Sequence, residues 1–579
     1  MYMQRAAFAV VVTMLAGSVA GAAVIYLDGR ATGAYEFGAG ERCPVMWYVQ
    51  ADANSPDSDG KSWETALPFL QDALMLAGVG DEVRVAQGVY RPGDFALSDR
   101  PGLGRAETFA LATGVTIKGG YAGLGAPDPD ARDVRRYETI LSGDLAGTLP
   151  VLTRDNCEAV LTVRGREEYA NCYHVVSAVG VDGSAVLEGV TITGGTANGP
   201  AYGEPAEAKF FHGGGVYVED AAPVFVDCTI TGNIAFVYGG PAAKGGGMYC
   251  TGSQPTLVRC RFVFNWVDDY DSDAYGAGMA NDDSSPILTD CTFESNGTWN
   301  WGGAMANMGA SSVKLAGCAF LNNRAQYGGG AIYHAPNNEQ VLTATNCLLA
   351  GNRSGWEGGA VKIPNGRGVL TNCTFTENRV RDSEYGRAVA CDNWDEAIVR
   401  AVNCIFRDGG GEFVSADPSW GAITFSNVEG GWEGQGNIDV DPLFVNPGVW
   451  YSTGTPSPLH DTWTAGDYHL KSQAGRWDAA RQEWVRDSVT SPCIDAGDPR
   501  VSVMYEPFPN GGVINMGAHG GTAEASKTYF GEFICEVVTM GDLNGDCVVN
   551  LTDLALLAGH WMEDNRIGMS SQGLEGPRP

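Results

Sequence analysis

One short pattern occurs seven times between residues 223 and 409, and it restricts the fold of this chain more than any other feature. A cysteine is followed two residues later by Phe, Ile or Leu and, in six of the seven copies, five residues later by asparagine. Successive cysteines are 26 to 32 residues apart. The seven cysteines are Cys228, Cys260, Cys291, Cys318, Cys347, Cys373 and Cys404.

Alternation of apolar and polar residues around each cysteine predicts short strands with one buried face. A repeat whose length varies while its strand content stays constant is typical of a solenoid, because loops absorb the insertions. Its coils stack about 4.8 Å apart, so equivalent residues form columns. We therefore expect a buried column of free cysteine thiols, a Phe column, and an Asn column at a turn with left-handed backbone geometry. Cys157 and Cys172, in an irregular insertion, are better candidates for a disulfide, as are Cys535 and Cys547.

A glycine-rich element precedes each copy, as in "HGGGVYV" (212–218) and "YGGGAIYH" (327–334). Together with the cysteine pattern, it resembles the right-handed parallel β-helix family, the fold of pectate lyases and of polymorphic outer-membrane-protein repeats. The resemblance covers residues 45–525 and implies an all-β solenoid. It also implies an N-terminal cap with a short amphipathic helix, and closing coils that include "DVDPLFVNPG" and "NMGAHGG". Because this fold hosts both enzymes and inert surface proteins, it assigns no activity.

The stretch "GDLNGDCVVNLTD" (541–553) carries oxygen-bearing side chains at alternate positions, followed by an apolar helical segment. This spacing predicts an EF-hand-type calcium loop. Its ligands would be Asp542, Asn544, Asp546, the Val548 carbonyl, Asn550 and Asp553. Residues 536–566 resemble one half of a dockerin type I module, which implies a small α-helical calcium-binding module. Cys547 replaces the usual glycine, and residues 567–579, an expected disordered tail, hold no second copy. A cohesin-like partner and a calcium-stabilised tail without a partner therefore stay open as alternatives.

The N-terminal stretch "MYMQRAAFAVVVTMLAGSVAGAA" (1–23) has one positive charge, an apolar run and small residues at its end. This pattern predicts a signal peptide, and so a protein that is secreted or displayed on a bacterial cell surface. The alternative is an uncleaved membrane anchor. The chain has a formal net charge of −32, which excludes nucleic acid as a partner because its phosphates would be repelled.

A group of carboxylates in two neighbouring loops is a candidate for a second metal site. Like charges in such a cluster repel one another unless a cation lies among them, so calcium is one interpretation. A solvated acidic loop is the other. The residues are Asp268, Asp269, Asp271, Asp273, Asp282 and Asp283.

Aromatic residues occur one or two positions ahead of the glycine bends in five successive coils. In a solenoid they would form a row along one edge, where their faces could stack on sugar rings. They could equally pack on each other and cover the turns. These residues are Tyr275, Trp301, Tyr327, Trp356 and Tyr385.

We expect a calcium-binding β-helix protein that binds a polysaccharide or a cell-surface glycan, or that serves in structural display. The alternative is a polysaccharide lyase or glycoside hydrolase that acts on an acidic polysaccharide. No catalytic residue is assigned, because "NDDS" and "GAHGG" match only parts of the polygalacturonase motifs, and no nucleophile motif or zinc spacing occurs in the sequence.

Overall fold

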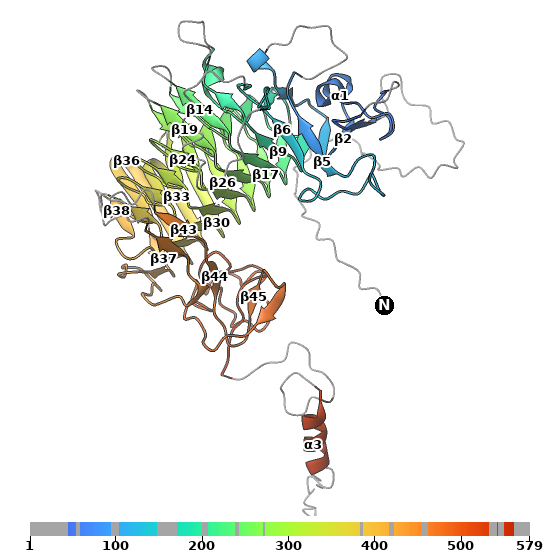
Figure 1. Ribbon diagram of the computed structural model, residues 1–579. Helices are drawn as coiled ribbons and strands as arrows, with labels where there is room; N and C mark the ends of the chain where they lie inside the picture. Colours follow the sequence, from blue (N-terminus) through green and yellow to red (C-terminus); the bar gives the residue numbers. More distant parts are fainter. Residues whose placement is uncertain are drawn as a thin grey trace, which may run out of the picture. The chain divides into compact units, whose positions relative to one another are not determined.

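The computed structural model describes residues 44–53, 58–93, 104–147, 171–199, 207–237, 242–269, 273–337, 339–381, 386–415, 422–452, 461–531, 541 and 549–560. Within them, three parallel sheets of 20, 11 and 7 strands run along a solenoid (Figure 1). In a representative coil, β16 (Met248–Thr251) and β17 (Thr256–Val258) join the 20-stranded sheet, β18 (Arg261–Val263) the 11-stranded sheet and β19 (Trp266–Asp269) the 7-stranded sheet. The fold is therefore a parallel β-helix, as the repeat predicts.

The strands of the 20-stranded sheet are β1 Met46–Val49, β2 Glu82–Ala86, β4 Phe109–Ala110, β5 Thr116–Tyr121, β7 Val176–Val179, β8 Val186–Glu188, β11 Val216–Glu219, β12 Val224–Val226, β16, β17, β21 Met279–Asp282, β22 Ile287–Thr289, β25 Met305–Gly309, β26 Val313–Ala316, β29 Ile332–Pro336, β30 Val341–Thr345, β33 Val361–Thr371, β36 Val389–Val402, β38 Phe413–Ser415 and β39 Ile423–Thr424. Those of the 11-stranded sheet are β3 Gly88–Tyr90, β6 Thr139–Ser142, β9 Thr191–Thr193, β13 Thr229–Thr231, β18, β23 Thr292–Glu294, β27 Ala319–Leu321, β31 Leu348–Ala350, β34 Thr374–Thr376, β37 Ile405–Arg407 and β40 Asn427–Val428. Those of the 7-stranded sheet are β10 Thr196–Ala197, β14 Ile234–Val237, β19, β24 Gly297–Thr298, β28 Arg324–Ala325, β32 Arg353–Ser354 and β35 Arg379–Val380.

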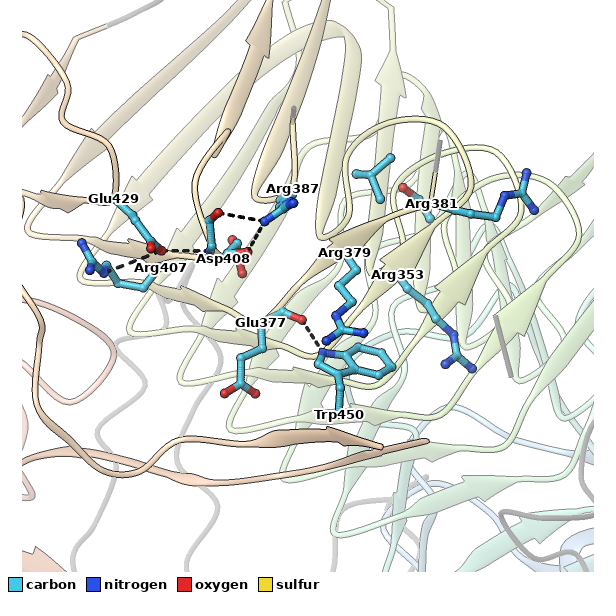
Figure 2. Close-up of a pocket in the computed structure, with 12 residues that line it drawn as sticks. Arg353, Glu377, Arg379, Arg381, Arg387, Arg407, Asp408, Glu429 and Trp450 are labelled. Atoms are coloured by element: carbon cyan, nitrogen blue, oxygen red, sulfur yellow. Dashed lines mark hydrogen bonds and ion pairs between the residues drawn. The ribbon is translucent and has the colours of Figure 1, made fainter. Parts of the chain in front are cut away.

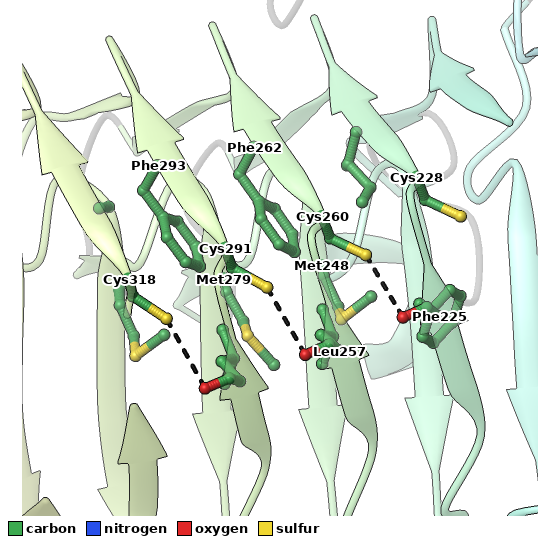
Figure 3. Packing of buried hydrophobic residues seen from close by; sticks show 14 of the residues in the cluster. Phe225, Cys228, Met248, Leu257, Cys260, Phe262, Met279, Cys291, Phe293 and Cys318 are labelled. Carbon is green, nitrogen blue, oxygen red and sulfur yellow. Dashed lines mark hydrogen bonds between the residues drawn. The ribbon is translucent and has the colours of Figure 1, made fainter. Parts of the chain in front are cut away.

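The predicted columns are present in the core. Phe262, Phe293 and Phe320 are fully buried and stack face to face, with ring centroids 4.5 and 4.9 Å apart. Each cysteine of the pattern is a buried free thiol, as predicted. The Sγ of Cys260 donates to the Phe225 carbonyl of the preceding coil at 3.5 Å (Figure 3). The prediction of a disulfide at Cys172 is wrong, because this residue is also a buried free thiol. Cys157, Cys535 and Cys547 lie outside the described residues.

The asparagine column is a continuous hydrogen-bonded ladder. In Asn296, Nδ2 donates to Asn323 Oδ1 at 3.0 Å and to the Phe262 carbonyl at 2.8 Å, and the backbone N–H donates to the same Oδ1 at 3.0 Å. The same bonds recur along the column Asn233, Asn265, Asn296, Asn323, Asn352 and Asn378. The expected left-handed geometry lies one residue earlier, as at Phe264 (φ 54°) and Ser295 (φ 55°). Because the preceding residue makes the turn, the side chain of each asparagine points into the core.

The N-terminal end of the solenoid contains the expected helix. Here α1 (Leu70–Leu76) buries Leu70 and Ala73 in the same apolar core as Trp47 and Val49. An apolar helix face thus covers the first coil, whose core would otherwise meet water.

The closing coils expected around 439–521 are not coils, which corrects that part of the sequence analysis. After β40 the chain forms three antiparallel pairs: β41 (Phe444–Asn446) with β44 (Asp467–Leu470), β42 (Val449–Tyr451) with β43 (Thr462–Thr464), and β45 (Arg476–Asp478) with β46 (Glu483–Val485). The first two pairs share a second apolar core with residues of the 11-stranded sheet. The apolar residues of this closing segment pack against the 11-stranded sheet, so the segment lies along the side of the solenoid.

The last described element is α3 (Leu551–His560). Asn550 Oδ1 accepts the Thr552 N–H at 2.7 Å, and Asp553 Oδ2 accepts the Asn550 N–H at 2.8 Å, so the two side chains cap the helix. None of the helices in the described part of the chain is long and apolar enough to cross a membrane.

Candidate functional site

An arginine directly follows the ladder asparagine in three successive coils, at Arg324, Arg353 and Arg379. Each arginine begins a two-residue strand of the 7-stranded sheet and lies in register with the next. The asparagine is held in the core by its hydrogen bonds. Because successive side chains along a strand point to opposite faces, the arginine that follows points outwards. The backbones of the three arginines therefore lie about 4.8 Å apart from one coil to the next, and like charges at directly paired positions repel one another.

The end of this arginine column opens into a pocket of about 570 Å³. Five of its twelve lining residues are arginines, although the whole chain has only 37 Lys and Arg among 579 residues. We call it the arginine pocket. Its lining residues are Arg353, Ser354, Glu377, Arg379, Val380, Arg381, Arg387, Arg407, Asp408, Gly409, Glu429 and Trp450 (Figure 2).

Trp450 reaches the arginine pocket from the closing segment, on β42. Its indole Nε1 donates to the Glu377 carbonyl at 2.9 Å (Figure 2). The guanidinium carbons of Arg379 and Arg353 lie 4.5 and 5.6 Å from its ring centroid. These cation–π contacts hold two arginines in place without neutralising them.

The arginines are positioned largely by carbonyl oxygens. Arg387 Nη1 donates to the carbonyls of Asp408 and Gly409 at 3.1 and 2.9 Å. Arg353 Nη1 donates to the Asp461 carbonyl at 2.5 Å. A carbonyl orients a guanidinium but leaves its full charge in the pocket.

Carboxylates offset part of this charge. Arg407 pairs with Asp439 at 2.7 Å, and Arg379 lies 3.5 Å from the Asp461 carboxylate. Burial, reinforced by the charge of Arg387, lowers the pKa of Arg379, although the charge of Asp461 acts in the opposite direction.

Two of the three carboxyl groups in the pocket lining are pushed toward their neutral forms. Burial raises the pKa of Glu377, even though Trp463 and Tyr468 donate to it. Burial also raises the pKa of Asp408, and the neighbouring Glu412 raises it further. Five arginines stand against three carboxyl groups in the lining, so the lining of the arginine pocket has an excess of positively charged residues. Planar guanidinium groups bind carboxylate or sulfate through paired hydrogen bonds, so the pocket suits an anionic ligand.

The predicted aromatic row exists in part. Trp301 and Tyr327 make an edge contact with centroids 5.4 Å apart, and Tyr327 stacks on Trp356 at 4.5 Å. Tyr275 and Trp301 both contact Tyr333, which the sequence analysis did not include. Trp356 is 51% exposed, whereas the other three are half-buried. Tyr385 lies outside the described residues.

Among the described residues of the predicted acidic cluster, no three carboxylates have oxygens within 4.8 Å of one another. Asp268 and Asp269 are buried on β19, and Asp273 accepts a hydrogen bond from Tyr275 at 3.0 Å. Asp282 pairs with Lys244 at 2.5 Å, so a lysine supplies a positive charge there. Asp283, at φ 51°, accepts the Ala310 N–H. Asp271 lies outside the described residues, as do Asp542, Asn544, Asp546 and Val548 of the tail loop.

The arginine pocket is not among the sites predicted from the sequence. The recurring Asn-Arg dipeptide in "NNRAQ", "GNRSG" and "ENRVR" was a visible signal of the arginine column. No local pattern indicates that Trp450, about 70 residues beyond Arg379, completes the wall.

Comparison with known proteins bears on the fold. A family described as "Right handed beta helix region" matches residues 177–380, and one described as "Disaggregatase related" matches residues 452–497. No curated protein matches the chain. The fold is therefore a right-handed parallel β-helix, which confirms that prediction.

Similar solved structures include pectate lyase Pel9A, which matches at 12% identity over 83% of this chain and 97% of its own, with a TM-score of 0.39. A rhamnogalacturonan lyase matches at 12% identity over 70% of this chain and 91% of its own, with a TM-score of 0.36. Pectin methylesterase PemA from Erwinia chrysanthemi matches at 12% identity over 69% and 94%, with a TM-score of 0.28.

Proposed function

We propose that this protein binds an acidic polysaccharide through the arginine pocket, as a secreted or cell-surface protein. The observation that carries the proposal is the gathering of five arginines around one pocket in a chain of net charge −32. Such a local excess of cations attracts a polyanion even though the protein as a whole is acidic.

The aromatic row gives the polysaccharide a path to the pocket. Ser354 lines the arginine pocket, and Trp356 follows it by two residues with half of its side chain exposed. Tyr327 supports the Trp356 ring from behind. A sugar ring stacked on Trp356 would place its neighbours along the row on one side and near the arginines on the other.

Charge-removing variants test this proposal. Replacing Arg379 and Arg381 together by Gln keeps the side-chain stems but removes two positive charges. A hydrogen bond to a charged group contributes about 1.5–3 kcal/mol, so the affinity for polygalacturonate should fall at least about tenfold. Isothermal titration calorimetry of the full chain measures the affinity.

Arg261→Gln is the matched control. Arg261 is also exposed and lies 3.5 Å from the carboxylate of Glu294, but it belongs to the 11-stranded sheet and not to the sheet that carries Arg379. It should bind like the unaltered protein. Equal affinities in all three proteins would contradict binding at the arginine pocket and would leave structural display as the function.

A polysaccharide lyase is the second candidate, favoured by the lowered pKa of Arg379. Elimination needs a base beside the uronate, and a lowered pKa makes the neutral, basic form of Arg379 more accessible than that of an exposed arginine. Unsaturated products from polygalacturonate, absent in Arg379→Gln, would establish it. If the polymer stays intact, binding without cleavage remains as the proposed function.

For the tail we propose calcium binding by the dockerin-like loop. Asn550 and Asp553 stand at the start of α3 as the loop spacing requires, and Asp553 is buried. Replacing Asp542 and Asp546 by Ala removes two ligands and should abolish calcium binding measured by calorimetry. Unchanged binding would contradict the assignment. Capture of a cohesin-like partner, with and without calcium, separates a docking module from a stabilised tail.

A further inference from the structure

A group of imidazole and carboxylate side chains lies in the closing segment, and none of them lines the arginine pocket. His469 comes from β44, and His519 and Glu524 come from the glycine-rich loop that follows Gly517. Their ligand atoms all lie within 4.8 Å of one another. Across the described ranges, no other group of three His, Cys, Asp or Glu residues meets this distance.

His469 is oriented by a second carboxylate. Its Nδ1 lies 2.6 Å from Asp467 Oδ1, so in the neutral ring Nδ1 carries the proton and Nε2 is left with a lone pair. Nε2 is buried and makes no hydrogen bond, and it lies 3.6 Å from Glu524 Oε2. A carboxylate on the far nitrogen is the usual support of a metal-binding histidine, because it fixes the tautomer and makes the ring more basic.

We propose that His469 Nε2, His519 Nδ1 and a Glu524 carboxylate oxygen bind one zinc-type divalent ion. Zinc bonds of 2.0–2.2 Å in tetrahedral geometry place the ligand atoms about 3.3–3.5 Å apart. The pairs measured here are 3.6 Å for His469 with Glu524 and 4.0 Å for His519 with Glu524. Small side-chain movements therefore close the site.

The ring of His519 has to make the largest movement. It now stacks on His469 with centroids 3.7 Å apart, whereas a bound ion lies in the plane of each ring. Gly517 and Gly521, with φ of 89° and 72°, flank this residue and give its loop a conformation that other residues rarely adopt. His519 can turn because it is on the accessible side of the stack, where its side chain is 31% exposed.

The donor set and its exposure define the class of ion. Two imidazoles and one carboxylate suit zinc and its neighbours nickel and cobalt, whereas calcium prefers oxygen ligands only. The Glu524 side chain is 49% exposed, which gives an entry path and leaves a coordination position for water. This site does not depend on the arginine pocket or on the calcium loop of the tail.

Zinc titration of the full chain, stripped of metal and held in excess calcium, tests the proposal. We expect one zinc ion per chain and a rise in melting temperature on adding it. His519→Phe keeps a ring stacked on His469 but removes one ligand, and Glu524→Gln keeps the shape but removes another. Each should weaken zinc binding at least about 100-fold, since even the loss of a supporting residue weakens metal affinity 10–100-fold.

Glu483→Gln is the control, because Glu483 is exposed on β46 outside the cluster, and it should bind zinc normally. Cobalt gives a second readout, as a tetrahedral visible spectrum that both ligand variants lose. Absence of zinc binding in the unaltered chain, or binding in both ligand variants as tight as in the unaltered chain, would overturn the proposal. The cluster would then be a histidine held between two carboxylates for structural reasons.

Discussion

Asp408, one residue earlier in the pattern than the ladder asparagine, takes over the hydrogen-bonding role that asparagine has in the six preceding coils. Its Oδ1 accepts from the backbone and the side chain of Asn378, at 2.6 and 2.9 Å, as an asparagine would. Its other oxygen is buried, and Glu412 lies beside it. Burial raises the pKa of both carboxyls above their ordinary values of 3.8 and 4.5. The folded chain therefore keeps a proton that the unfolded chain releases, and stability falls as pH rises above these ordinary values.

Asp408→Asn should weaken this pH dependence. The amide can donate to Glu412 without a shared proton, so we expect a variant more stable than the unaltered chain at pH 8, by about 1–3 kcal/mol. Thermal melts between pH 5 and 8 measure the effect. If the melting temperature changes with pH by the same amount in both proteins, a shared proton at this end of the ladder is contradicted.

Trp356 and Trp301 belong to one row but differ in their surroundings. Trp356 is half-exposed, so Trp356→Ala should reduce polygalacturonate affinity by about 1 kcal/mol and leave the melting temperature nearly unchanged. Trp301 contacts both Tyr327 and Tyr333, so Trp301→Ala should cost about 2 kcal/mol of stability. If Trp356→Ala lowers stability instead and leaves affinity intact, the row serves only to cover the turns.

At the scale of elements, the asparagine ladder explains why coils of different length stay in register. Every Nδ2 group donates twice and every Oδ1 accepts twice in the middle of the ladder. Asn296→Asp would turn both donors into an acceptor that faces the Phe262 carbonyl and Asn323 Oδ1. We expect a loss of about 3 kcal/mol or more at neutral pH.

Asn337→Asp is the control for this ladder variant, because Asn337 is exposed. It should leave the melting temperature within about one degree. A similar small change for Asn296→Asp would show that the ladder contributes little to stability.

The repeating coils and the N-terminal helix could be predicted from the sequence, whereas the hairpins of the closing segment could not. Cys260, Phe262 and Asn265 each recur at fixed spacing, so one coil defines the position of the next. The hairpins that contain Trp450 and His469 occur once, and their place depends on which face of the solenoid their apolar residues cover. A sequence pattern carries no information about that choice, which is why the arginine pocket and the histidine cluster emerge only from the structure.

At the scale of the whole molecule, a chain of net charge −32 concentrates five arginines in one pocket. The acidic remainder repels polyanions, so binding should depend strongly on the local geometry of the pocket and weaken as salt screens it. This contrast distinguishes the arginine pocket from a general basic surface.

Comparing polygalacturonate with the same polymer after methyl esterification tests the central claim most directly. Esterification leaves the sugar rings in place but removes the carboxylates that the arginines would bind. We predict by calorimetry that the unaltered protein binds the acidic polymer and loses at least about tenfold in affinity for the ester, with binding to the acid weakening as salt increases. Equal affinity for both polymers, or binding independent of salt, would contradict recognition of an acidic polysaccharide by the arginine pocket.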